Sequence, residues 1–202
     1  HPQGLANQST REVAVSSSLG RTLMQTVEVF TGGGYELLQW RSQRHDTDGR
    51  VIATASSDGS KTDSAWSCCG KESETDANGR TTLYAYDDLN RVTSTTQQGV
   101  SGTFASQSDI KTVYTYDGLG RATQTLILAG DLSQTTYSGY DSAGRLRAST
   151  DAAGLQTTYY YSADNLASTV TAPGGATQTS TRHIDGRTQS ITGPAAPAQY
   201  YT

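Results

Sequence analysis

The two cysteines are the side chains with the clearest capacity for covalent chemistry. Cys68 and Cys69 are adjacent, in the stretch Trp66-Ser67-Cys68-Cys69-Gly70, and the 202-residue sequence contains no other cysteine. Two thiols cannot supply the four ligands of a structural zinc site, and their spacing is not C-x-x-C. Three interpretations stay open: a vicinal disulfide, which an extracellular setting would favour, pairing with another chain, and two free buried thiols.

Carboxylate, imidazole and hydroxyl groups are the other candidates. Asp46-Thr47-Asp48-Gly49 begins like a calcium loop, but the twelfth position is Ser57, where such a loop carries Glu. Turn capping is therefore the preferred role of these aspartates. His45 and His183 lie in turn-like stretches and are interpreted as turn substitutions, and no G-x-S-x-G elbow is present. We predict no catalytic residue, no cofactor and no metal site.

Most of these aspartates belong to a recurring signature, Tyr-Asp-x-x-Gly-Arg. It is complete at 116–121 and 140–145, carries Asn for Gly at 86–91, and is degenerate at 45–50, 161–166 and 182–187. The sequence is therefore built by repetition. The signature residues to which we assign a structural role are Tyr86, Asp87, Asn90, Arg91, Tyr116, Asp117, Gly120, Arg121, Tyr140, Asp141, Gly144, Arg145, Tyr161, Gly186 and Arg187.

Each signature position has a physical use in a hairpin turn. Tyrosine ends a strand, and Asp accepts backbone N–H bonds from the turn that follows. Gly, or Asn at 90 and 165, suits a position with positive φ. Arg begins the returning strand, where it can pair with a turn Asp or lie over a tyrosine ring. A second turn type, D-x-x-G, stands at 76–79 and 151–154.

Composition favours an all-β fold of repeated antiparallel hairpins over a globule with a thick core. Hydrophobic residues make up 34% of the chain, which has 12 tyrosines but 2 phenylalanines, and the mean hydropathy is -0.56. A polar repeat chain of this kind buries surface only against its neighbouring units. The net charge of -4 provides no basic stripe for nucleic acid, and no apolar run reaches the length of a membrane span.

We predict three regions. Residues 1–44 are an irregular segment followed by a hairpin, whose strands are Thr22–Phe30 and Tyr35–Arg44. Residues 45–193 are the repeat region, with an insertion at Gly99–Asp109, and 194–202 are a linker or tail. Because the chain begins with His1 rather than Met, we expect it to be a piece of a longer polypeptide.

The signature copies, together with D-x-x-G-x-x-T-x-Y-x-Y-D from Asp76 to Asp87, resemble the RHS/YD-repeat family. That family includes bacterial Rhs polymorphic toxins, shell components of insecticidal Tc toxins, wall-associated proteins and teneurins. The resemblance implies a strip of β-hairpins that curves into a hollow shell. Self-cleavage is not carried over from the family, because the sequence has no D-P-x-G motif. A full shell needs many more repeats, so we expect an arc of such a shell or a smaller unit that assembles with other copies.

The resemblance implies a non-enzymatic, structural part of an extracellular or secreted, bacterial β-shell that encloses or displays a polypeptide. The expected partners are the remainder of a larger YD-repeat polypeptide or other copies of the chain, an enclosed passenger polypeptide, and a glycan. Two alternatives are an adhesion or glycan-binding module, since exposed tyrosines can stack on sugars, and a subunit that assembles into fibres or tubes through unpaired edge strands.

Overall fold

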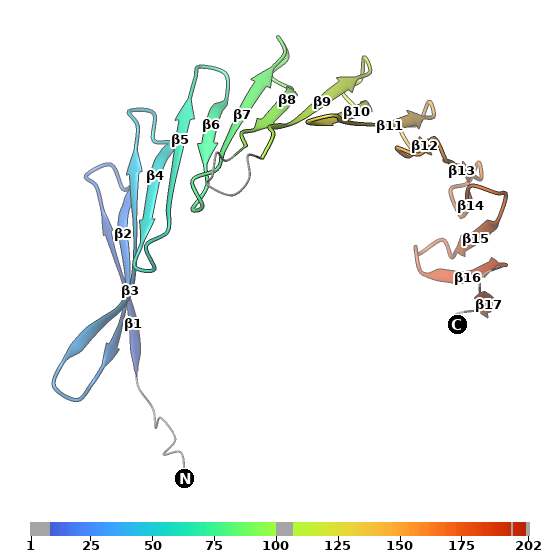
Figure 1. Ribbon diagram of the computed structural model, residues 1–202. Helices are drawn as coiled ribbons and strands as arrows, with labels where there is room; N and C mark the ends of the chain where they lie inside the picture. Colours follow the sequence, from blue (N-terminus) through green and yellow to red (C-terminus); the bar gives the residue numbers. More distant parts are fainter. Residues whose placement is uncertain (1–8, 100–106, 195, 201–202) are drawn as a thin grey trace. The chain divides into compact units, whose positions relative to one another are not determined.

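The protein is built of strands and turns throughout its described part. The computed structural model describes residues 9–99, 107–194 and 196–200, and no helix occurs in these ranges. The chain divides into two compact units, residues 1–109 and 110–202, described separately below (Figure 1). The prediction of an all-β chain of antiparallel hairpins is confirmed. The boundary between the units directly follows the predicted insertion at Gly99–Asp109.

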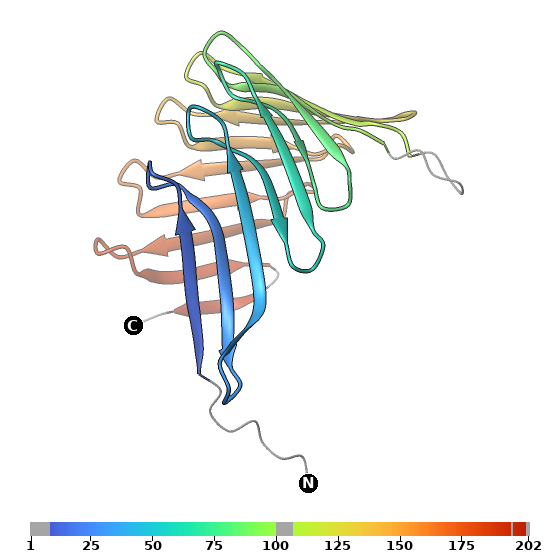
Figure 2. The ribbon, with the colours of Figure 1, turned by 90° about the vertical axis from the view of Figure 1, so that its left-hand side faces the viewer.

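Unit 1 is a meander in which each strand pairs antiparallel with the next one along the chain. Figure 2 shows its first strands side by side. Its strands are β1 (Thr10–Ser16), β2 (Thr22–Phe30), β3 (Tyr35–His45), β4 (Val51–Ser56), β5 (Lys61–Trp66), β6 (Lys71–Thr75), β7 (Thr81–Tyr86) and β8 (Val92–Gln97).

Unit 2 has the same plan, with sequential antiparallel pairing from its first strand to its last. Its strands are β9 (Ile110–Tyr116), β10 (Ala122–Ala129), β11 (Leu132–Tyr140), β12 (Leu146–Thr150), β13 (Gln156–Tyr161), β14 (Ala167–Thr171), β15 (Thr177–Arg182), β16 (Thr188–Gly193) and β17 (Ala196–Tyr200).

Threonine gives the strands both their propensity and their cross-strand contacts. Its branched Cβ suits a pleated surface, and its hydroxyl can pair with a hydroxyl on the next strand. Such pairs join Thr54 to Thr62 at 2.8 Å and Thr169 to Thr179 at 2.9 Å. In a sheet with one face covered, apolar side chains would occupy the positions of these threonine pairs.

The sheets have no interior of their own. Among the described residues, no hydrophobic or polar side chain is fully buried. Strands such as β5 and β13 alternate between exposed and half-buried positions. The chain exposes 13978 Å², whereas two compact globules of half its mass each would together expose roughly 11,000 Å². Stability must therefore come mainly from contacts between adjacent hairpins.

Two terminal expectations need correction. The segment before Thr22 is predicted to be irregular, yet Thr10–Ser16 forms β1, because the alternation around Val13 matches β2 and Arg11 pairs with Glu28 at 2.7 Å. The predicted tail 194–202 contains β17, which continues the ladder from β16. The predicted hairpin of Thr22–Phe30 with the strand from Tyr35 is confirmed as β2 and β3.

Candidate functional site

The signature residues form a braced turn at the end of a hairpin. In the β9–β10 turn, the backbone N–H of Asp117 donates to Arg121 O at 2.9 Å, and the backbone N–H of Gly120 donates to Asp117 O at 3.0 Å. Its Oδ1 accepts the backbone N–H groups of Leu119 and Arg121 at 2.9 and 3.0 Å. Gly120 has φ of 81°, a left-handed conformation that costs other residues free energy. The turn thus needs Asp at its start and Gly or Asn at its corner.

The same geometry recurs along both units. Asp46, Asp87 and Asp141 each accept the backbone N–H of the arginine four residues later at 2.9 Å. Asn90 and Asn165 take the corner with φ of 58° and 60°. A register shift of the kind made by a β-bulge follows the turn at several of these hairpins, for example between β7 and β8 and between β11 and β12.

Each signature arginine also braces its own aspartate through its guanidinium. Arg121 donates from Nε to Asp117 Oδ2 at 2.7 Å and places Nη2 2.6 Å from the same oxygen. Arg145 repeats this with Asp141 at 2.8 and 2.7 Å. The planar fork of arginine suits this double contact, which a lysine ammonium cannot reproduce.

The free side of the guanidinium reaches the following signature turn. Arg121 lies over the Tyr140 ring, with Cζ 4.6 Å from the centroid, and its Nη1 donates to Asp141 O at 3.5 Å. Arg145 lies 4.5 Å over the Tyr161 ring and donates to Asn165 Oδ1. The sequence left open whether arginine binds the turn Asp or a tyrosine ring. The structure shows both contacts made by one side chain.

In three of the turns the aromatic residue donates a hydrogen bond back to the preceding hairpin. Tyr140 Oη donates to Ala122 O at 3.0 Å, Tyr86 Oη donates to Lys71 O at 3.0 Å, and Trp66 Nε1 donates to Val51 O at 3.0 Å. We call this chain of contacts, from Asp to Arg to the aromatic ring of the next turn, the signature ladder. Within each unit it runs along one edge, which we call the signature edge.

Two further copies of the turn escaped the sequence analysis because serine replaces Asp. Ser17 Oγ accepts the Arg21 backbone N–H at 3.2 Å, and Arg21 Nη1 donates to Asp46 O at 2.9 Å, so 16–21 begins the ladder. Ser67 opens the β5–β6 turn, where Arg50 Nη1 donates to its carbonyl at 2.8 Å. The signal was present: Leu19-Gly20-Arg21 repeats Leu119-Gly120-Arg121, and Trp66 stands where tyrosine is expected.

The turn carboxylates are held in the ionised state by their own turns. The backbone N–H of Arg121, followed by its guanidinium, holds the pKa of Asp117 below its usual value. The backbone N–H of Arg145 lowers the pKa of Asp141, and partial burial opposes that effect. The guanidinium of Arg91 is the main cause of the lowered pKa of Asp87. These groups are thus occupied by folding and are poorly placed to transfer protons.

The aspartates considered as calcium ligands, and His45, take part in the signature turn at 45–50. Asp46 Oδ1 and Oδ2 both accept hydrogen bonds from Arg50, and Asp48 pairs with Arg50 at 3.0 Å. In the described ranges, no three His, Cys, Asp or Glu residues gather as a metal site would require. His45 ends β3 in the place of the signature tyrosine, with Nδ1 buried and without a hydrogen bond.

The cysteines form the tip of the β5–β6 turn. Both side chains are exposed and both are free thiols in the structure. The interpretation as buried thiols is therefore wrong, because a turn tip in a single-layer sheet has nothing to cover it. The vicinal disulfide and the pairing with another chain stay predictions.

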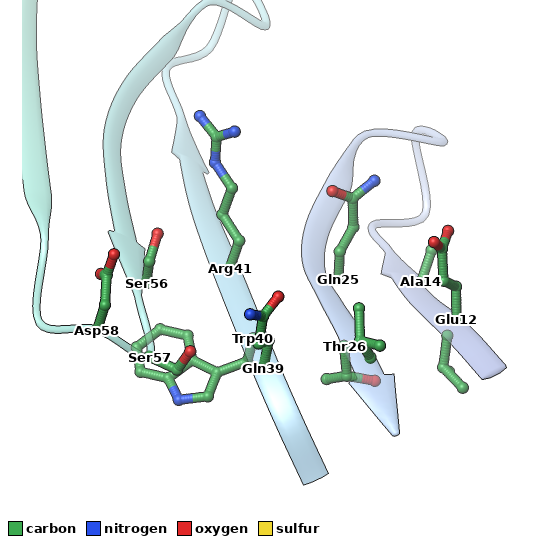
Figure 3. A pocket seen from close by; sticks show the side chains of 12 residues that line it. Glu12, Ala14, Gln25, Thr26, Gln39, Trp40, Arg41, Ser56, Ser57 and Asp58 are labelled. Carbon is green, nitrogen blue, oxygen red and sulfur yellow. The ribbon is translucent and has the colours of Figure 1, made fainter. Parts of the chain in front are cut away.

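A shallow hollow of about 600 Å³ crosses β1 to β4 in unit 1. Ala14, Gln25, Arg41 and Ser56 occupy directly opposed positions on successive strands, so their side chains share one face. Figure 3 shows Gln25 and Arg41 extending the same way from neighbouring strands. The amide of Gln25, the guanidinium of Arg41 and the hydroxyl of Ser56 can form hydrogen bonds with a polar ligand.

The part of the chain that the structure describes contains no helix of the length and apolarity needed to cross a membrane.

Comparison with known families identifies two segments of the chain. The model of the RHS Repeat matches residues 72–99 and 140–177. The matched segments contain the signature turns at Asp87 and Asp141, and the second includes the turn that begins at Ser162. No curated protein sequence matches the chain.

Comparison with solved structures supports the same fold. The crystal structure of TcdB2-TccC3-TEV aligns with a TM-score of 0.53 at 15% identity, over 95% of this chain and 12% of that one. Those of TcdB2-TccC3-Cdc42 and TcdB2-TccC3 align with TM-scores of 0.44 and 0.45, each at 15% identity and over 96% of this chain, and over 13% and 14% of theirs. The chain therefore spans a small fraction of the length of these proteins.

Removing the tyrosine hydroxyl tests the return bond of the ladder. Tyr140→Phe removes the bond to Ala122 O but keeps the ring under Arg121, so we expect a loss of about 1 kcal/mol in the free energy of unfolding, measured with urea. The matched control is Tyr160→Phe, at a residue that is 70% exposed and should change stability by less than about 0.5 kcal/mol. Equal effects of the two substitutions would contradict the ladder.

Acid should weaken the ladder. Because the pKa values of Asp87, Asp117 and Asp141 are lowered in the folded state, their contribution is complete above the unfolded value of about 3.9 and is lost as the pH falls through the lowered values. We expect a constant melting temperature from pH 7 to about 5 and a decline below about 4, followed by circular dichroism.

Asp141→Asn is the matched variant, because it keeps an oxygen for the backbone N–H groups but loses the charge. It should melt earlier at neutral pH and show a shallower decline in acid, whereas the same change at the exposed Asp131 should leave the decline as it is. A decline identical in wild type and Asp141→Asn would show that these carboxylates do not cause it.

Proposed function

Since the chain carries RHS repeats, we propose that it is a non-enzymatic section of the wall of a larger RHS-repeat β-shell. The shell is extracellular, either secreted or at the cell surface, and it encloses or displays another polypeptide. The chain has the repeat type and the fold for a structural role.

The observation that carries this proposal is a sheet with strong lateral bracing and no interior. Arg121 and Arg145 each engage the Asp of their own turn and the tyrosine of the next turn, which leaves little of the signature for catalysis. Both faces of each sheet stay partly exposed, with no fully buried side chain among the described residues. A strip of this kind suits a wall, because its stability comes from lateral contacts and its faces are free to meet other polypeptide.

The test uses the complete polypeptide that carries these residues. Electron microscopy should show a hollow particle, and a polypeptide segment inside it should resist protease while the particle is intact. Arg121→Ala breaks the ladder at Tyr140 and should expose that segment, while the same change at Arg147, an exposed arginine of β12, should not. A solid particle, or equal protease sensitivity in both variants, would sink the proposal. Fibres or tubes would favour self-assembly through the edge strands.

A specific observation also favours the glycan-binding alternative. In unit 2, Gly139, Ala148 and Thr158 are directly opposed on β11, β12 and β13, at a hollow of about 490 Å³. Tyr137 and Tyr160 lie two residues before and after this floor, on the same face, and are 51% and 70% exposed. Two exposed rings beside a floor of small residues suit the stacking of sugar rings.

An array of glycans incubated with the 202-residue chain tests this alternative. Binding to a subset of saccharides should fall at least about tenfold in Tyr137→Ala and Tyr160→Ala, which corresponds to about 1.4 kcal/mol. Tyr35→Ala is the control, because Tyr35 is 42% exposed in unit 1, away from this hollow. Absence of binding across a broad array would count against a glycan role and would leave the wall proposal standing.

A further inference from the structure

The β5–β6 turn departs from the other signature turns in length and composition. Trp66 pairs with Lys71 across four intervening residues, whereas Tyr86 pairs with Val92 across five. Ser67 bonds backbone to backbone with Gly70 at 2.9 Å, and the cysteines fill the two positions between them. The turn thus lacks the Asp–Arg brace and presents two adjacent thiols at its tip.

The two thiols lie on neighbouring residues and are open to solvent. Both side chains are exposed. The hydrogen bond from the neighbouring Cys68 thiol is the main cause of a raised pKa at Cys69. Two thiols on adjacent residues, both open to solvent, can react with one reagent together rather than singly.

We propose that Cys68 and Cys69 form a dithiol modification site, which a small-molecule disulfide oxidises reversibly to a disulfide between the two neighbours. One cysteine thiolate attacks a sulfur of the reagent, forms a mixed disulfide and releases the first reagent thiolate. The other cysteine then attacks the protein sulfur and releases the second. Both cysteines are oxidised, the reagent is reduced to two thiols, and the two cysteine protons end on those thiols.

The site is connected to the ladder on both sides. Arg50 Nη1 donates to Ser67 O at 2.8 Å on one side. On the other, the Tyr86 ring covers Gly70 so closely that an added Cβ would lie 2.7 Å from Tyr86 Cζ, and Tyr86 Oη donates to Lys71 O at 3.0 Å. The Cys69 N–H donates to Ser67 Oγ at 3.3 Å.

A disulfide between adjacent residues closes a small ring that contains the peptide joining them. That peptide supplies the Cys69 N–H, so ring closure must disturb its bond to Ser67 and shift the backbone between Arg50 and Tyr86. Oxidation should therefore loosen the ladder at this turn and leave the turns of unit 2 unchanged. The β5–β6 turn is thus a redox-sensitive position in the signature ladder, whose other turns are held by ion pairs and aromatic contacts.

The experiment treats the 202-residue chain with oxidised glutathione and digests it with trypsin without reduction. Peptide 62–71, which contains both cysteines, should lose the mass of two hydrogen atoms and regain it after dithiothreitol. Cys68→Ser and Cys69→Ser should each take up one glutathione instead. Two thiols left free, two stable glutathione adducts on the wild type, or a disulfide-linked dimer would each overturn the proposal.

Phenylarsine oxide tests the reduced pair independently, because trivalent arsenic bridges two thiols. One equivalent should bind the wild type and protect both cysteines from alkylation, and neither serine variant should retain it after washing. Hydrogen exchange tests the connection to the ladder: amides in 67–71 should exchange at least about tenfold faster after oxidation, and those in 141–145 should not. Unchanged exchange in 67–71 would refute the loosening of the ladder.

Discussion

One arginine side chain carries the architecture from each hairpin to the next. Its Nε and Nη2 close the turn against Asp, and its Nη1 and its plane engage the following turn, as Arg121 does with Asp117, Tyr140 and the carbonyl of Asp141. In return, the hydroxyl of Tyr140 donates a hydrogen bond to Ala122 O in the preceding hairpin. The same side chain therefore forms the turn and joins neighbouring hairpins. An exposed ion pair alone contributes little to stability, but the fixed geometry of this Asp–Arg pair increases its contribution.

This network matters because the sheets have no core to stabilise them. Hydrophobic side chains such as Leu37 and Leu38 on β3 are 56% exposed, and hydroxyl pairs such as Thr75 with Thr81, at 2.9 Å, join the strands. Energetically each hairpin depends on the one before and the one after, as in other repeat arrays. Because such a chain needs no apolar core, most of its residues can be polar, which explains the low mean hydropathy of -0.56.

Much of the fold could be predicted from the sequence, because each signature residue has one dominant use. Asp at a turn start, Gly or Asn at positive φ, and Thr-rich strands follow from local chemistry, and the structure has them in those places. The sequence indicated that an arginine can lie over a tyrosine ring, but which ring it covers could not be predicted, since the partners are about twenty positions apart. The turns at Ser17 and Ser67 were missed because the required property is an oxygen acceptor, which serine also supplies. β1 was missed because its pattern is evident only against β2.

Within each unit, the two edges of the sheet differ in how freely the length of their turns can vary. Turns of the signature edge are nearly constant in length, because each contacts its neighbours. Turns at the other edge of each unit range from the two-residue link Gly130-Asp131 to five-residue links such as 76–80, between β6 and β7. That margin is where length can change without disturbing the next repeat. Natural insertions should therefore occur mainly at this edge, and it is also the place for grafted epitopes or labels. The signature edge keeps its periodicity, while the other edge is open to variation.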